Sequence, residues 1–133
     1  MGFFDFLKSK AAVVKRGYLS TYDQEVLKGR WKNIEDLLAA NNPSSRRQAV
    51  LEADKVLDYA LDRLYPGLTA TGERLKLARE IFKYKREIYD QVWFAHKVRN
   101  EMVHNLNFEM PVVEAAATAE KIKAGLLVLG ASL

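Results

Sequence analysis

Apolar residues recur at helical spacing through most of the chain, and this periodicity constrains the fold more than any other feature of the sequence. Between residues 21 and 40 they recur every three or four positions, as on one face of an α-helix: Val26, Leu27, Trp31, Ile34, Leu37 and Leu38. No segment alternates apolar and polar residues over a useful length, which is the pattern of a half-buried strand. The sequence therefore predicts an all-α protein.

Turn signals divide the chain into helices that are joined by short loops. We expect the first long helix over residues 21–40, with Thr21 and Gln24 forming a capping box at its start. Asn42 is the expected N-cap of the second helix, because Pro43 suits the first helical position. Thr71 is a candidate cap for the third. The later helices are expected over residues 44–64, 73–82, 86–106 and 111–129.

Short connections imply antiparallel neighbours, so we predict an up-and-down bundle of four to five helices with a short N-terminal helical extension. A chain of 133 residues is most naturally one domain. Within it, residues 1–42 hold the extension and the first helix, and residues 43–133 form the core. The last helix is rich in alanine, so it either lies centrally in the bundle or contributes to a dimer interface.

Composition excludes several classes of protein. The chain has no cysteine, which excludes disulfides and thiol catalysis and fits a reducing cytoplasm. No stretch reaches the roughly 18 consecutive apolar residues of a membrane span, so we expect no stable membrane insertion. Phe3, Phe4 and Phe6 fit a short helix on a membrane surface or, as we prefer, a segment that packs on the core or on a partner subunit. The net charge of +4 is compatible with RNA.

The strongest candidate site is the run Arg-Asn-Glu-Met-Val-His at residues 99–104. It places an arginine, an amide and one of only two histidines on neighbouring turns of one helix. Such a set suits the cleavage of RNA. His104 can take a proton from a ribose 2′-hydroxyl or give one to the leaving 5′-oxygen, and Arg99 can stabilise the charge of the phosphorane. Asn100 can orient either group. This chemistry needs neither a metal nor another cofactor.

At about 100° per residue, the helix that carries this run has distinct faces. The expected core face holds Ile88, Ala95, Met102 and Leu106. Arg99 flanks this face and should be half buried. The solvated side holds Asp90, Lys97 and Glu101. A polar ridge holds His96, Asn100 and His104, and Tyr89 and Trp93 continue it. We regard His96, Lys97, Tyr89 and Trp93 as candidate RNA-contacting or assisting residues.

Cleavage by 2′-hydroxyl attack works best with both an acid and a base, and His104 supplies one group per chain. A two-fold dimer that pairs two copies of this helix would bring two copies of His104 into one cleft. His96 could be the second group, but it lies two turns away, roughly 12 Å along the helix axis. We therefore favour the homodimer.

Several charged residues also have structural interpretations. His104 could simply be a cation at a helix C-terminus, and Arg99 could pair with Glu52, Asp54 or Asp58. Asp54 and Asp58 share a helix face, which could approach the candidate site but is more simply a solvated acidic face. A basic run fits either an RNA backbone or a solvated face: Arg74, Lys76, Arg79, Lys83, Lys85 and Arg86.

The motif Arg99-Asn100-x-x-x-His104, preceded by residues 93–98, resembles the signature of the HEPN (higher eukaryote and prokaryote nucleotide-binding) superfamily. The resemblance spans residues 44–129: residues 51–57 resemble the first long helix of the family, and residues 74–78 resemble its middle helix. It implies an all-α bundle that dimerises through its motif helices. It also implies a metal-independent endoribonuclease, often a toxin or an antiviral effector. Arg99, Asn100 and His104 match the motif, whereas His96 is not a motif position.

The same resemblance leaves a second role open. Some members of the superfamily have lost activity and serve as binding or scaffold modules, including partners of small nucleotidyltransferases. The expected partners are therefore RNA, a second copy of the chain, and an antitoxin or nucleotidyltransferase-type protein.

Overall fold

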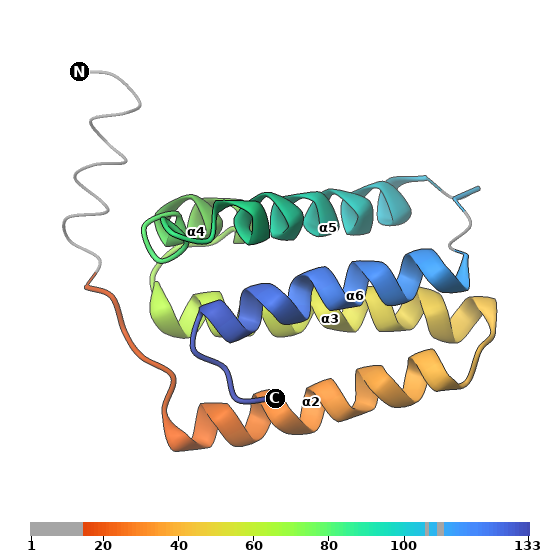
Figure 1. Cartoon of the computed structure of the whole chain (residues 1–133), viewed down its shortest axis with the longest axis horizontal. Coiled ribbons are helices and arrows are strands. Elements are labelled where there is room, and N and C mark those ends of the chain that lie inside the picture. Colours follow the sequence, from red (N-terminus) through yellow and green to blue (C-terminus); the bar gives the residue numbers. More distant parts are fainter. Residues whose placement is uncertain (1–14, 106, 109–110) are drawn as a thin grey trace.

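The computed structural model describes residues 15–105, 107–108 and 111–133, and these form an all-α bundle without strands (Figure 1). The expected N-terminal helical extension, with Phe3, Phe4 and Phe6, lies outside the described residues. No helix within the described ranges is long and apolar enough to cross a membrane. The helices are α2 (Thr21–Ala39), α3 (Pro43–Leu64), α4 (Thr71–Ala78), α5 (Arg86–His104) and α6 (Val112–Val128).

The four long helices lie side by side, with α3 and α6 between α2 and α5 (Figure 1). Of the two roles expected for the alanine-rich α6, the structure favours the central one. Ala115, Ala119, Ile122 and Leu126 of this helix are buried, and α6 contacts both α3 and α5. Small side chains let α6 approach its neighbours closely.

The helix starts correct one expectation and confirm another. The capping box of α2 uses Ser20 and Asp23, not Thr21 and Gln24: the Ser20 hydroxyl accepts from Asp23 N at 3.1 Å, and the Asp23 carboxylate accepts from Ser20 N at 2.9 Å. Thr21 was one position too late, because it is already the first helical residue. At α3, Asn42 is the N-cap as predicted and accepts from Ser45 N at 2.9 Å, with Pro43 following.

The short helix α4 is displaced from the predicted residues 73–82. It ends at Ala78, and turns carry the chain from Arg79 to Tyr84. Thr71 is not its N-cap, because Ala70 holds that place and the Thr71 hydroxyl donates instead to Asp58 at 2.7 Å.

Both ends of the described chain are fastened to the bundle. Gly17 N donates to Leu64 O at the end of α3, at 2.8 Å. The amide of Gln24 on α2 donates to Gly130 O at 2.8 Å and accepts from Ser132 N at 2.8 Å. A single side chain on α2 therefore holds the segment that follows α6.

Gly125 marks the closest approach of α6 to α5. A Cβ placed on Gly125 would overlap the side chain of Val92, which is fully buried and branched at Cβ, whereas a Cβ on Gly29 of α2 would meet nothing. We expect Gly125→Ala to lower the free energy of unfolding by about 1–3 kcal/mol through overpacking. The matched change Gly29→Ala should raise it by about 0.5–1 kcal/mol, because glycine is a poor helix former. Urea unfolding of both variants measures the difference, and equal effects would contradict the close approach.

Asp23 is a buried acid at the junction of α2 and α3. Its side chain accepts from the hydroxyl of Tyr59 at 2.8 Å and lies 3.1 Å from Arg63 Nε. Burial alone raises the pKa of Asp23, but the hydrogen bonds from Ser20 and Tyr59 and the charge of Arg63 outweigh it, so the pKa is held below its usual value. The ionised form therefore stabilises the fold.

Because the folded-state pKa of Asp23 lies below its unfolded value of about 3.9, its contribution is present above that pH. It is lost as the pH falls through the folded-state pKa. We expect Asp23→Asn to lower the unfolding free energy by about 1–3 kcal/mol at neutral pH and by less in acid. Urea unfolding from neutral to acid pH tests this, with the exposed Asp36→Asn as control. A loss for Asp23→Asn that is constant with pH would contradict it.

Candidate functional site

Helix α5 carries the candidate residues, and its core and solvated faces are those that the sequence predicts. Ala95 and Met102 are fully buried, Ile88 is partly buried, and Asp90, Lys97 and Glu101 are exposed. Arg99 is half buried, with 32% of its side chain exposed. Leu106, also expected on the core face, lies outside the described residues. Arg99 and Asn100 therefore lie at the boundary between core and solvent.

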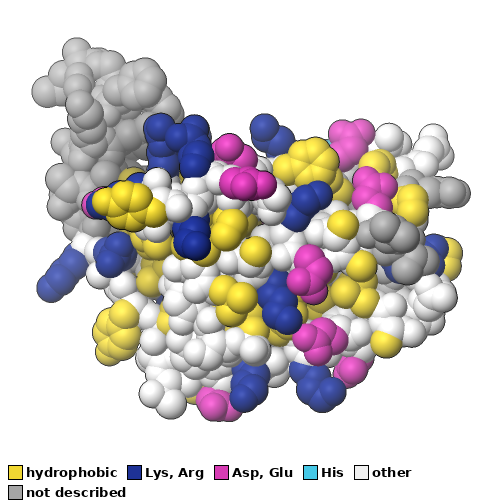
Figure 2. Space-filling view, viewed as in Figure 1, with side chains coloured by type: hydrophobic (Ala, Val, Ile, Leu, Met, Phe, Trp, Pro, Cys, Tyr) yellow, Lys and Arg dark blue, Asp and Glu magenta, His cyan; other side chains and the backbone are white. Residues whose placement is uncertain are grey.

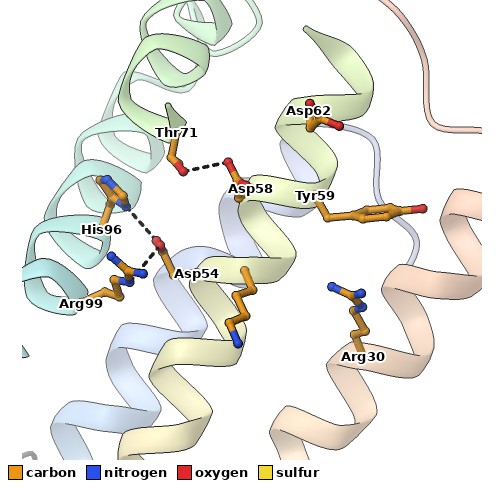
Figure 3. A pocket seen from close by; sticks show the side chains of 9 residues that line it. Arg30, Asp54, Asp58, Tyr59, Asp62, Thr71, His96 and Arg99 are labelled. Carbon is orange, nitrogen blue, oxygen red and sulfur yellow. Dashed lines mark hydrogen bonds and ion pairs between the residues drawn. The ribbon is translucent and has the colours of Figure 1, made fainter. Parts of the chain in front are cut away.

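Asp54 on α3 is the residue that this boundary faces. It is 5% exposed, and its two oxygens point to two side chains of α5 (Figure 3). Oδ1 lies 2.8 Å from His96 Nδ1, and Oδ2 lies 3.5 Å from Arg99 Nε. A buried carboxylate needs such partners because its desolvation is costly. The pairing therefore joins α3 to α5 at a defined position.

Asn100 completes a closed ring of four side chains, which we call the Asp54 ring: Asp54, His96, Asn100 and Arg99. Arg99 Nη1 donates to Asn100 Oδ1 at 3.0 Å, and Asn100 Nδ2 lies 3.5 Å from His96 Nε2. These partners fit one arrangement of protons, in which His96 Nδ1–H donates to Asp54 and His96 Nε2 accepts from Asn100. The ring thus holds His96 and Arg99 in fixed orientations.

The Asp54 ring opens on a pocket of about 380 Å³, which is in the size range of small-ligand sites. His96 and Arg99 line it from α5, and Arg30 reaches it from α2 (Figure 3). Asp58, further along α3, accepts from Arg74 at 2.5 Å as well as from Thr71. The acidic side chains that line the pocket are therefore largely paired with other side chains of the protein.

His104 lies apart from this ring. It is the last residue of α5, and its exposed side chain has no hydrogen bond or ion pair among the described residues. The end of α5 is nevertheless held in place, because Arg47 of α3 donates to Met102 O at 2.9 Å. This bond satisfies one of the helix-terminal carbonyls that lack a partner within the helix. The structure thus brings together Arg99, Asn100 and His96 and leaves His104 accessible one turn beyond Asn100.

The aromatic residues of the predicted ridge have different outcomes. Tyr89 is 6% exposed, and its hydroxyl donates to Leu75 O at 2.9 Å, so it lies in the core and not on an exposed ridge. Trp93 is partly buried and meets Tyr89 edge-on at 6.4 Å and His96 at 6.2 Å between ring centroids. Trp93 therefore packs against both the core and the His96 ring.

Two expectations about charged residues are wrong. Asp54 is not on a solvated acidic face, although its place beside Ala53 and Leu57 in the apolar stripe of α3 was a signal of burial. Arg74 is not part of an exposed basic face, because it is 7% exposed and bonds to Asp58, with Asp62 at 3.4 Å. The burial of each residue depends on a partner from another helix, which the pattern along a single helix does not reveal.

Within the described residues, no group of three or more His, Cys, Asp or Glu side chains could hold a metal ion. No protein-family model, curated protein or solved structure matches the chain.

We expect Asp54→Ala to lower the free energy of unfolding by about 1–3 kcal/mol, because it leaves His96 and Arg99 without their buried partner. The control is Asp36→Ala, which removes an exposed pair with Lys32 and should change stability by less than about 1 kcal/mol. Urea unfolding compares the two variants. Equal, small losses would show that the Asp54 ring does not hold α3 and α5 together.

Proposed function

We propose that this chain is a metal-independent endoribonuclease of the HEPN type, with Arg99, Asn100 and His104 as its catalytic residues. The observation that carries the proposal is the exposure of His104 one helical turn beyond an arginine and an amide that the Asp54 ring holds in place. An accessible histidine beside an oriented guanidinium suits proton transfer and phosphate stabilisation.

The proposed reaction is attack of a ribose 2′-hydroxyl on the adjacent phosphorus. His104 takes the hydroxyl proton or gives a proton to the 5′-oxygen. The new bond joins the 2′-oxygen to phosphorus, the bond from phosphorus to the 5′-oxygen breaks, and the products are a 2′,3′-cyclic phosphate and a 5′-hydroxyl. This step consumes no water and requires no metal ion.

Arg99 is suited to bind the phosphate because the Asp54 ring occupies only part of its guanidinium. One N–H is directed to Asn100, and Nε faces Asp54. A guanidinium has five N–H donors in a planar fork, so the remaining donors, on the two Nη atoms, can form a two-point contact with phosphate oxygens. Asn100 fixes the plane of this fork through its 3.0 Å bond to Nη1.

His96 is better suited to a positioning role than to proton transfer. Its side chain is 12% exposed, with one ring nitrogen against Asp54 and the other against Asn100. The second proton-transfer group in our proposal is therefore His104 of a second copy, in a homodimer through α5. Such an enzyme would serve as a toxin or an antiviral effector, held in check by an antitoxin or nucleotidyltransferase-type partner.

The test is incubation of the full chain with total RNA in EDTA, with analysis of the fragment ends. We expect fragments with 2′,3′-cyclic phosphate and 5′-hydroxyl ends, and His104→Ala should lower the rate about 10²- to 10⁴-fold. Glu101→Gln, an exposed change on the same helix, is the matched control and should cleave normally. Cleavage by His104→Ala at the normal rate would refute the proposed mechanism.

A binding module without catalysis is the second candidate, and one observation favours it. The pocket beside the Asp54 ring is large enough for a small ligand, and Arg99 already has a carboxylate partner there. This alternative predicts that neither the unaltered chain nor His104→Ala cleaves RNA. It also predicts a saturable complex with a nucleotide or a protein partner. The same incubation separates the two, since only the ribonuclease produces cyclic phosphate ends.

A further inference from the structure

We infer that the end of α4, the start of α5 and the turn between them form a docking site for single-stranded RNA, remote from the catalytic end of α5. The inference rests on the proposed function for the identity of its ligand, but it uses residues that the proposed reaction does not. Five exposed basic residues define this site, which we call the basic turn: Lys76, Arg79, Lys83, Lys85 and Arg86.

Burial of one side chain explains why the basic turn faces solvent. Phe82 is 1% exposed and packs against Tyr89 with the two rings tilted and their centroids 5.3 Å apart, so it anchors the segment between α4 and α5 in the core. Backbone bonds such as Lys85 N to Phe82 O, at 2.7 Å, keep this segment tightly turned. Lys83, Tyr84 and Lys85 are consequently held outward.

The cations of the basic turn are largely free to meet an anion. Lys76, Arg79, Lys83 and Lys85 have no carboxylate partner among the described residues, and Arg86 has only an exposed contact of 3.4 Å with Asp90. Four of the five line one shallow cleft of about 480 Å³. Figure 2 shows Lys and Arg side chains gathered at the end of the molecule where α4 and the start of α5 lie.

Tyr84 identifies the ligand as a nucleic acid strand and not simply as any anion. It is 86% exposed, and Lys83 Nζ lies over its ring at 5.1 Å. An exposed aromatic ring among basic side chains is the combination with which proteins bind single strands, because bases stack on the ring while the cations contact phosphates. A duplex would hide its base faces from Tyr84.

The spacing to the catalytic end sets the size of the substrate. The basic turn and His104 lie at opposite ends of α5 (Figure 1). Nineteen helical residues extend over about 28 Å. At the roughly 3.4 Å per nucleotide of a stacked strand, this distance corresponds to about eight nucleotides. Strands longer than this can reach both sites, whereas shorter strands reach only one.

Binding is measured first, by fluorescence anisotropy of the unaltered chain with a labelled oligodeoxythymidine of roughly twelve nucleotides. This probe lacks the 2′-hydroxyl, so it is not cleaved by the proposed reaction. Arg79→Gln with Lys83→Gln should weaken binding roughly ten- to thirty-fold near 0.1 M salt and lower the slope of log K against log salt by about 1.4. Lys28→Gln with Lys32→Gln is the matched control, because both pairs change the net charge from +4 to +2.

Tyr84 supplies the second measurement. Tyr84→Ala should weaken binding about ten-fold, Tyr84→Phe should bind normally, and Tyr22→Ala, which removes another exposed tyrosine, should have no effect. Equal losses in the two charge-matched pairs would overturn the inference. Unchanged binding by Tyr84→Ala, with polyglutamate or anionic vesicles competing as well as the oligonucleotide, would also overturn it, since the surface would then attract any polyanion.

Cleavage of RNA separates this inference from the proposed function. If the chain is a ribonuclease, the Arg79→Gln, Lys83→Gln pair should lower kcat/KM on strands well beyond eight nucleotides and leave it unchanged on much shorter ones. If the chain binds the oligonucleotide through the basic turn but cleaves nothing, the docking site stands and the proposed function fails. Cleavage that is equally fast in the double variant at every length would overturn the docking site alone.

Discussion

The carboxylate of Asp54 joins α3 to α5, and the arrangement of the candidate site depends on this contact. A buried charge is tolerated only where partners replace its water, and here His96 and Arg99 do so at 2.8 and 3.5 Å. Because both partners belong to α5, one acid fixes the rotation of that helix about its axis. Asn100 then ties the two partners to each other, so the guanidinium of Arg99 has little freedom.

Helix α5 consequently has a structural middle and two accessible ends. Its middle supplies Val92, which meets Gly125 of α6, and its side chains His96, Arg99 and Asn100 form the Asp54 ring with Asp54 of α3. Its start carries exposed cations, and its end carries the exposed His104. This division lets a rigid element set the distance between the two surfaces that we propose to be functional, and groups on regular secondary structure are placed more accurately than those on loops.

Periodicity was sufficient to predict the class of fold, because it reflects burial along each single helix, and turn signals placed most helix boundaries. It placed Arg99 at the edge of the core and His104 on the polar side. It could not place Asp54 against His96, which is 42 residues away, because that contact depends on how two helices face each other. For the same reason the burial of Arg74 and Tyr89 was missed. The position of the cap at Ser20, one residue early, reflects local hydrogen bonding that several sequences can satisfy.

The two hydrogen bonds of Gln24 link the first described helix to residues 106 and 108 positions later in the chain. They bear on how the protein folds during synthesis. The ribosome synthesises the chain from its N-terminus, so α2 and α3 can pair early. The contact between α2 and the segment that follows α6 forms only after Ser132 has emerged. Until α6 itself has emerged, the surfaces of α3 and α5 that it covers remain open to chaperones or to a neighbouring nascent chain.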